Sequence, residues 1–250
     1  MTLHFISLGL SDEKDISLKG LETIKKCDKV YLENYTSLLN CSKEDLEKVY
    51  GKAVILAERE LVESKADTIL NEAAKKEVAF LVIGNAFTAT THTDLMLRAR
   101  ERGIEINFIH NASILNAVGV TGLSLYKFGK ITSIPFDYDN IETPYDIIKD
   151  NRKIEAHTLV LLDLDPSKNK YLKISEAIRY LLKVELKRGE KVFTENTLCI
   201  GCSRIGNSQQ VIKAGNAKDL LNLDFKKPPY CLIIPSKLHF MEEEALGRYK

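Results

Sequence analysis

The chain has few of the features that mark membrane, secreted or nucleic-acid-binding proteins. No apolar run approaches the roughly 20 residues that a membrane span requires. The opening MTLHFISLGL has no basic flank before its apolar residues, so we expect a first strand there and no signal peptide. A net charge of +1 argues against a broad nucleic-acid footprint. Five scattered cysteines favour a reducing compartment over a disulfide framework, so we expect a cytoplasmic protein with no membrane or nucleic-acid partner.

Several catalytic motifs are also missing. No glycine-rich turn is followed by Lys-Ser or Lys-Thr, which argues against a nucleotide phosphate loop. Neither G-x-G-x-x-G nor G-x-S-x-G occurs, so a standard dinucleotide fold and a serine-hydrolase elbow lack support. Cys199 and Cys202 have metal or redox spacing, but no second pair accompanies them and both lie in an apolar stretch. We interpret them as structural thiols and expect no metal.

What is present is an alternation of apolar runs and amphipathic stretches. The 250 residues, 44% hydrophobic and 28% charged, are typical of a globular protein with one large domain or two smaller ones. In the first half this alternation predicts a mostly parallel sheet with helices on both faces. We expect one strand at 29–33. Ser42 has an acid three residues later and predicts a capping box for a helix at 43–50, and Ser64, with the same spacing, predicts the start of another helix. The stretch 119–129 has three glycines and no clear period, and we place the crossing between domains there. We therefore expect an amino-terminal α/β domain at 1–115 and a carboxyl-terminal α/β domain with a mixed sheet at 116–250.

The most informative stretch is 80–116. An apolar run ends at Gly84, a small-residue segment follows, and we expect a helix to begin near Thr91, which has an acid three residues later. A second predicted strand, 106–109, leads directly into another polar turn that begins at His110. Open α/β sheets place their ligands at the carboxyl ends of strands. The stretch therefore predicts a nucleotide-like ligand at these two turns.

Some side chains near these turns could have either a functional or a structural role. His92 and His110 flank the turns and are as suited to facing a ligand as to holding a turn or a helix end. Arginines at 98, 100 and 102 are expected to form a solvated last helical turn, favoured by the helix dipole. The residues alone therefore indicate a two-domain α/β enzyme with a ligand at strand ends, and they do not name the reaction.

The amino-acid sequence of this stretch is specific enough to suggest a family. GNAFTATTHTDLMLRA at 84–99 and IHNASILNAVGVTGLSLYKFG at 109–129 closely resemble the diphthine synthase family, the methyltransferases of diphthamide biosynthesis. The opening FISLGLSDEKDISLKGLETIKKCDKVYLENYTS is similar to the same family, as are HTLVLLDLD and PPYCLIIPSKLH further on. The resemblance covers essentially the whole chain. HNASI looks eukaryotic, whereas the short chain and the compact loop after Asp163 look archaeal, and we favour an archaeal-type member.

This resemblance implies a fold, a cofactor and a substrate. The family has the two-domain α/β tetrapyrrole-methylase fold of class III methyltransferases, with S-adenosylmethionine bound in the cleft between domains, and it usually works as a homodimer. The substrate is elongation factor 2 bearing a 3-amino-3-carboxypropyl group on one histidine. The amino group is methylated to a trimethylammonium, with S-adenosylhomocysteine as the other product. Eukaryotic members also methylate the carboxylate to a methyl ester.

The resemblance also implies site residues. The family's cofactor positions fall here on Leu10, Asn85, Thr88, Ser113, Ile114, Leu162, Ile205 and Tyr230. The family usually has aspartate where this chain has Asn85, histidine in place of Tyr230 and glycine in place of Ser7. No residue is assigned to catalysis. Two other hypotheses stay open: a module that binds S-adenosylmethionine or elongation factor 2 without turnover, and a methylase of the same fold that acts on a tetrapyrrole.

Overall fold

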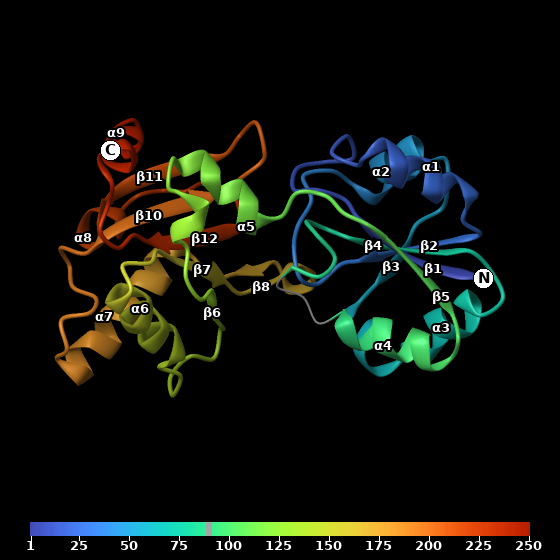
Figure 1. The fold of residues 1–250 in the computed structure, drawn as a ribbon, viewed down its shortest axis with the longest axis horizontal. Coiled ribbons are helices and arrows are strands. Elements are labelled where there is room, and N and C mark those ends of the chain that lie inside the picture. Colours follow the sequence, from blue (N-terminus) through green and yellow to red (C-terminus); the bar gives the residue numbers. More distant parts are fainter. Residues whose placement is uncertain (89–91) are drawn as a thin grey trace. The chain divides into compact units, whose positions relative to one another are not determined.

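The computed structural model describes residues 1–88 and 92–250, which form two compact units, Met1–Ile114 and Leu115–Lys250. Both units are α/β structures built on a five-stranded sheet (Figure 1). Within the described residues, no helix has the length and apolar character needed to cross a membrane. The stretch 119–129, where we predicted a crossing between domains, lies inside the second unit and contains two short 3₁₀ turns, Val118–Thr121 and Leu125–Lys127.

The first unit is built on a parallel sheet, as the alternation predicts. Its strand order is β3-β2-β4-β1-β5, and every pairing is parallel. The strands are β1 (Thr2–Ser7), β2 (Lys29–Glu33), β3 (Ile55–Ala57), β4 (Val78–Val82) and β5 (Glu105–Ile109). Because all five run the same way, their carboxyl ends share one edge of the sheet.

Helices cover both faces of this sheet. They are α1 (Leu18–Lys26), α2 (Lys43–Tyr50), α3 (Asp67–Ala73) and α4 (Thr93–Glu101). Alternate side chains of one strand enter different cores, since successive residues of a strand point to opposite faces. Ile6 packs with the α1 and α2 side chains, whereas Phe5 packs with those of α3 and α4. Figure 1 shows the two helix pairs on opposite sides of the sheet.

The helix starts test the predicted capping residues. The Ser42–Asp45 capping box before α2 is present, with hydrogen bonds of 3.1 and 2.9 Å between the two residues. The expected cap at Ser64 is wrong, because that residue ends a separate π-helical turn, Glu60–Ser64, and α3 begins only at Asp67. The expected cap at Thr91 lies outside the described residues.

The second unit has a mixed sheet of order β11-β10-β12-β7-β6, in which only β6 and β7 pair in parallel. Its strands are β6 (Thr132–Ile134), β7 (Thr158–Leu162), β10 (Leu198–Ser203), β11 (Val211–Asn216) and β12 (Tyr230–Ile234). A small hairpin, β8 (Leu164–Asp165) with β9 (Lys170–Tyr171), follows β7. The helices are α5 (Ile114–Ala117, at the boundary of the units), α6 (Thr143–Lys153), α7 (Ile174–Arg188), α8 (Ala217–Leu220) and α9 (Phe240–Gly247).

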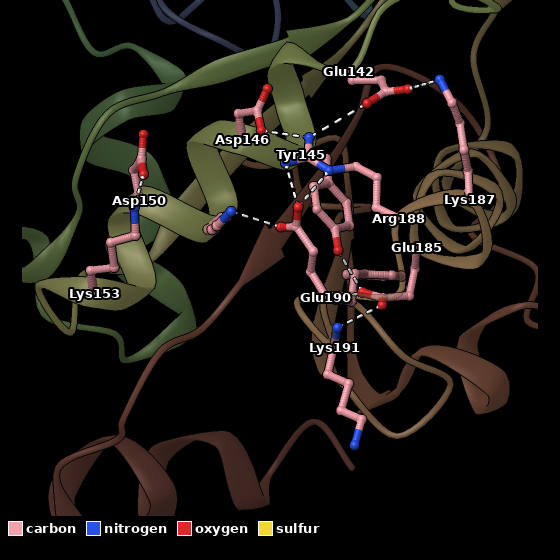
Figure 2. Close-up of polar contacts among 12 residues, drawn as sticks. Glu142, Tyr145, Asp146, Asp150, Lys153, Glu185, Lys187, Arg188, Glu190 and Lys191 are labelled. Carbon is pink, nitrogen blue, oxygen red and sulfur yellow. Dashed lines mark hydrogen bonds and ion pairs between the residues drawn. The ribbon is translucent and has the colours of Figure 1, made fainter.

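An arginine joins α6 to α7 in this unit. The Arg188 guanidinium contacts Asp146 at 2.6 Å and Glu190 at 2.9 Å, and it lies over the Tyr145 ring, 4.7 Å from the ring centre (Figure 2). The Tyr145 hydroxyl in turn donates to Glu185 at 2.7 Å. These contacts fix the two helices against each other by charge as well as by their apolar faces.

A buried carboxylate fixes α9 in the second unit. Glu242 is 3% exposed and accepts hydrogen bonds from Lys127 Nζ at 2.6 Å and from the backbone N–H groups of Ser124 and His239 at 2.9 and 2.8 Å. His157 Nε2 lies 3.1 Å from the same carboxylate. Residues from the YKFG and PSKLH stretches therefore meet here in a structural role.

Candidate functional site

The carboxyl edge of the first sheet gathers five of the residues implied by the family resemblance. Strands β4, β1 and β5 are neighbours in the sheet. Leu10 follows β1, Asn85 and Thr88 follow β4, and Ser113 and Ile114 follow β5. The fold therefore brings these residues from three separated stretches to one edge, where parallel α/β sheets carry their ligands.

Two glycines shape this edge. Gly9 and Gly84 have φ values of +86° and +78°, and each N–H bonds to the other's carbonyl, at 3.3 Å and 2.7 Å. A Cβ at Gly9 would lie 2.7 Å from the Asp15 Cβ, so no larger residue fits there. The Asp15 carboxylate accepts the N–H groups of Leu10 and Ser11 at 3.0 and 2.7 Å. The Asp15 side chain therefore stabilises the turn after β1.

Asn85 is built into the turn after β4. Its Oδ1 accepts from the Phe87 N–H at 3.3 Å and the Thr88 hydroxyl at 3.4 Å. Its Nδ2 lies 3.3 Å from the Asn111 carbonyl oxygen and 3.3 Å from His110 Nδ1. An aspartate has no N–H to donate to these two groups. The amide thus links the ends of β4 and β5, and a carboxylate would lose the hydrogen bond to the Asn111 carbonyl.

Ser7, where the resemblance implies a glycine, also contributes a hydrogen bond to this turn. It is 1% exposed, and its hydroxyl accepts the Ala86 N–H at 3.1 Å. The replacement therefore adds a hydrogen bond between the end of β1 and the turn after β4. It leaves the edge of the sheet intact.

The two histidines differ sharply. His110 is exposed and reaches Asn85, so it holds the turn. His92 is fully buried, lies edge-on to the Phe80 ring with 5.2 Å between ring centres, and has no hydrogen-bond partner for either nitrogen among the described residues. Burial lowers the pKa of His92 to about 4, so the ring is neutral at pH 7. His92 is therefore not a strong base at this edge.

The predicted solvated arginine turn is only partly right. Arg98 and Arg102 each contact Asp67 of α3 at 2.6 Å. Arg100 is exposed, as expected. Two of the three arginines therefore tie α4 to α3, a contact between residues more than thirty positions apart.

In the second unit, three further candidate residues share an edge. Leu162 ends β7, Tyr230 begins the neighbouring β12, and Ser203, which pairs with Tyr230, ends β10 just before Ile205. The Tyr230 hydroxyl donates to the Lys226 carbonyl at 2.6 Å. The Ser203 hydroxyl is buried and has no hydrogen-bond partner among the described residues. The sheet register therefore collects these positions across three adjacent strands.

The predicted structural role of the cysteines agrees with their surroundings. Cys199 and Cys202 are fully buried in β10, and burial raises the pKa of Cys199. The pKa of Cys202 is also raised, by a hydrogen bond with Cys231 and by burial. Thiols held in the protonated form are poor nucleophiles and poor metal ligands.

Comparison with known proteins decides the family. Residues 2–221 match the family described as tetrapyrrole (corrin/porphyrin) methylases. The chain belongs to this family. It is 50% identical to the diphthine synthase of Methanosarcina mazei, over 98% of this chain and 94% of that protein. It is 46% identical to the diphthine methyl ester synthase of Saccharomyces cerevisiae, over 98% and 88%.

Solved structures agree with this tetrapyrrole-methylase assignment. A crystal structure of diphthine synthase superposes with a TM-score of 0.92 at 38% identity, covering 100% of this chain and 96% of that one. The predicted likeness to diphthine synthases and the predicted tetrapyrrole-methylase fold are both confirmed. The archaeal and yeast relatives are similarly close, so these identities do not choose between the two named activities.

The family implies a methyl donor, and the edge of each sheet has a feature that suits a bound ligand. A Cβ at Gly84 would meet only Leu10 Cδ2, at 3.8 Å, so the sheet edge is open beside the turn. In the second unit, the unpaired Ser203 hydroxyl offers a buried polar group that a ligand can satisfy. A nucleoside with a charged amino-acid tail has both the apolar surface and the polar groups that such edges bind.

Sequence reasoning passed over one group of residues at the edge of the first sheet. Tyr35 follows β2, and Arg59 lies just after β3, with its guanidinium 5.1 Å from the centre of the Tyr35 ring. The stretch YLENYTS, which supplies Tyr35, was part of the family resemblance but carried no assigned role. An unassigned polar motif directly after a predicted strand was the signal that could have found it.

Proposed function

We propose that this chain transfers methyl groups from S-adenosylmethionine to the amino group of a 3-amino-3-carboxypropyl-histidine on elongation factor 2. As a relative of diphthine synthases over nearly its whole length, the chain is a methyltransferase of diphthamide biosynthesis. That likeness is the observation that carries the proposal. The geometry supports it, because the implied cofactor residues of each unit gather at one sheet edge.

Different residues would bind different parts of the cofactor. We propose that the backbones of Ser113, Ile114 and Leu162 pair with the adenine and its sugar, and that the turn from Asn85 to Thr88 lines the methionine portion. Ile205 and Tyr230 are the further residues that we propose bind the cofactor. When bound, S-adenosylmethionine supplies a methyl group activated by a positive sulfonium.

Positioning would provide most of the rate enhancement. Holding two reactants in line can contribute roughly 7–11 kcal/mol to catalysis. The attacking amine must be neutral, so an ammonium has to lose its proton before each transfer. The Asn85 turn, tied to both β4 and β5, gives a rigid wall against which the donor can be aligned. No strong base is required of this edge.

Neutral Asn85 motivated the reading as a non-catalytic binding module. The structure supplies another reason for an amide at this position, since Asn85 Nδ2 reaches the Asn111 carbonyl and His110. We therefore favour a working enzyme. We further propose that it acts in the cytoplasm, as a homodimer, and that its product is the trimethylamine without the methyl ester.

Transfer of labelled methyl groups tests the substrate. The protein is incubated with methyl-labelled S-adenosylmethionine and, in separate reactions, with elongation factor 2 bearing the aminocarboxypropyl group, unmodified elongation factor 2 or a precorrin. We expect label only on the first. Label on the precorrin alone would support the tetrapyrrole methylase instead. Binding of the donor without transfer to any acceptor would support the binding module.

A further inference from the structure

An arginine with one long ion pair among the described residues stands at the carboxyl edge of the first sheet. The Arg59 side chain is 64% exposed, and the nearest carboxylate among the described residues is that of Glu63, at 3.8 Å. The guanidinium lies over the Tyr35 ring, 5.1 Å from its centre. An arginine stacked on an aromatic face keeps its planar fork of donors available for a carboxylate or phosphate.

The ring beneath this arginine is itself fixed. Tyr35 is only 7% exposed, and its backbone N–H donates to the buried Glu33 carboxylate at 2.8 Å. The same carboxylate accepts the N–H and the hydroxyl of Thr36, at 2.6 and 2.7 Å. The His92 ring stands edge-on to the Tyr35 ring, with 6.3 Å between centres. Arg59 therefore rests on a rigid platform.

The backbone around Arg59 is also unusual. The loops after β2 and β3 are joined, because the Asn34 N–H donates to the Ala57 carbonyl at 3.2 Å and its side chain donates to Glu58 at 3.2 Å. Arg59 directly precedes the π-helical turn Glu60–Ser64. Such turns are rare in proteins and occur often at functional sites.

We propose that Arg59 binds the carboxylate of the acceptor's aminocarboxypropyl group. The assignment rests on the proposed function, which supplies an acceptor whose amine and carboxylate sit on the same carbon atom. A guanidinium can hold that carboxylate with two parallel hydrogen bonds, which fixes the direction of the neighbouring amine.

The sheet order makes the required span short. β3, which precedes Arg59, and β4, which precedes the Asn85 turn, flank β2. Adjacent strands are about 4.8 Å apart, so β3 and β4 are separated by on the order of 10 Å. The Arg59 side chain and the acceptor can together cover this distance. A carboxylate held by Arg59 would leave its amine on the side of the donor turn.

Holding the carboxylate would also help the chemistry. A cation beside the acceptor favours the neutral amine over the ammonium, because like charges repel. The paired carboxylate is also kept away from the donor. Arg59 thus becomes a residue that recognises the acceptor and directs methyl groups to nitrogen.

The test pairs a change in the enzyme with a change in the substrate. Wild-type protein and the Arg59→Gln, Arg59→Lys and Arg100→Gln variants are assayed on two forms of elongation factor 2. One form carries the 3-amino-3-carboxypropyl group, and the other, made by semisynthesis, carries a 3-aminopropyl group without the carboxylate. Arg100 is the matched control, since it is an exposed arginine of the same unit. Thermal unfolding and the Kd for S-adenosylmethionine verify that each variant is folded.

The expected result is a loss of discrimination. Wild type and Arg100→Gln should prefer the carboxylate form by roughly 10- to 100-fold in kcat/KM, the range of a charge-assisted contact. Arg59→Gln should lose most of this preference, chiefly through KM, while its Kd for S-adenosylmethionine stays unchanged. Arg59→Lys should fall between, because an ammonium lacks the bidentate fork.

Two results would overturn the assignment. If Arg59→Gln is folded and discriminates between the acceptors as strongly as wild type does, Arg59 does not bind the carboxylate. If wild-type protein methylates neither form, the proposed function fails and this inference fails with it. The two failures differ in whether wild type is active.

Discussion

Replacing the buried carboxylate Glu242 with glutamine should destabilise the second unit in a pH-dependent way. Burial opposes the charged form of Glu242, but hydrogen bonds from His239 N–H, Lys127, Ser124 N–H and His157 outweigh it and lower its pKa to about 2. Ser236 N–H donates to His157 Nδ1 at 3.0 Å, so Nε2 carries the proton that faces Glu242. All four groups are donors, which a carboxylate satisfies and an amide does not.

The size of the effect follows from the pKa of Glu242. A carboxyl group that titrates at 4.5 when unfolded and at about 2 when folded contributes about 3 kcal/mol to stability at pH 7. Because the folded pKa is lowered, this contribution is complete above pH 4.5 and disappears as the pH falls through 2. At pH 3 roughly half of it remains.

The assay is urea unfolding of wild type and Glu242→Gln at pH 7 and pH 3, followed by circular dichroism. We expect the difference in unfolding free energy to fall from about 3 kcal/mol at pH 7 to roughly half of that at pH 3. Glu243→Gln, an exposed neighbour in the same helix, is the control and should change stability by less than about 0.5 kcal/mol. An equal loss at both pH values would refute the reasoning, since it would show that the charge of Glu242 does not matter.

Four further substitutions test other parts of the structure by the same unfolding assay, and Asn85→Asp is tested by turnover as well. His92→Phe should raise stability at pH 7 by about 1 kcal/mol, because it removes two buried nitrogens that have no partner among the described residues. It should also reduce the loss of stability between pH 6.5 and 4, where only the unfolded chain protonates His92; an unchanged pH profile would contradict this. Gly122→Ala should lower stability by about 2 kcal/mol or more, since φ is +87° and the new Cβ would overlap that of Ala245. Gly51→Ala, at φ +65° in open space, should lower it by only about 1 kcal/mol; equal losses would argue against the close contact. Asn85→Asp should lower stability by about 1 kcal/mol, because the hydrogen bond from Nδ2 to the Asn111 carbonyl is lost. It should not raise turnover; a faster enzyme would instead indicate that the wild-type chain lacks a carboxylate needed for catalysis.

Elements with strong local signals could be predicted from the sequence. The helix at 43–50 and the strand at 29–33 were placed residue for residue, because a capping box marks the start of the helix and a short apolar run, Val-Tyr-Leu, marks the strand. Ser64 has the same spacing from an acid as Ser42 does, yet it caps no helix. The spacing between a serine and an acid does not by itself predict a helix start. Here Ser64 ends the π-helical turn, and α3 begins at Asp67.

The roles of the site residues depended on partners far away in sequence. From the sequence, Asn85 stood where an aspartate was expected and had no evident role of its own. Its contacts with His110 and Asn111 show that the amide links the ends of two strands. Arg98 looked solvated because its partner Asp67 belongs to another helix. Arg59 and Tyr35 are likewise brought together only by the pairing of β2 with β3. The edge of the sheet was predictable from the sequence, whereas the contacts across it were not.

The most direct test of the proposed function is mass spectrometry of the target histidine peptide after reaction with S-adenosylmethionine that carries a deuterated methyl group. The substrate is elongation factor 2 bearing the aminocarboxypropyl group, and fragmentation locates each label. We predict three labelled methyl groups on the amino nitrogen and none on the carboxylate. An additional label on the carboxylate would contradict the proposed product but keep the enzyme. No label on the nitrogen, with folded protein and a competent substrate, would contradict the proposed function itself.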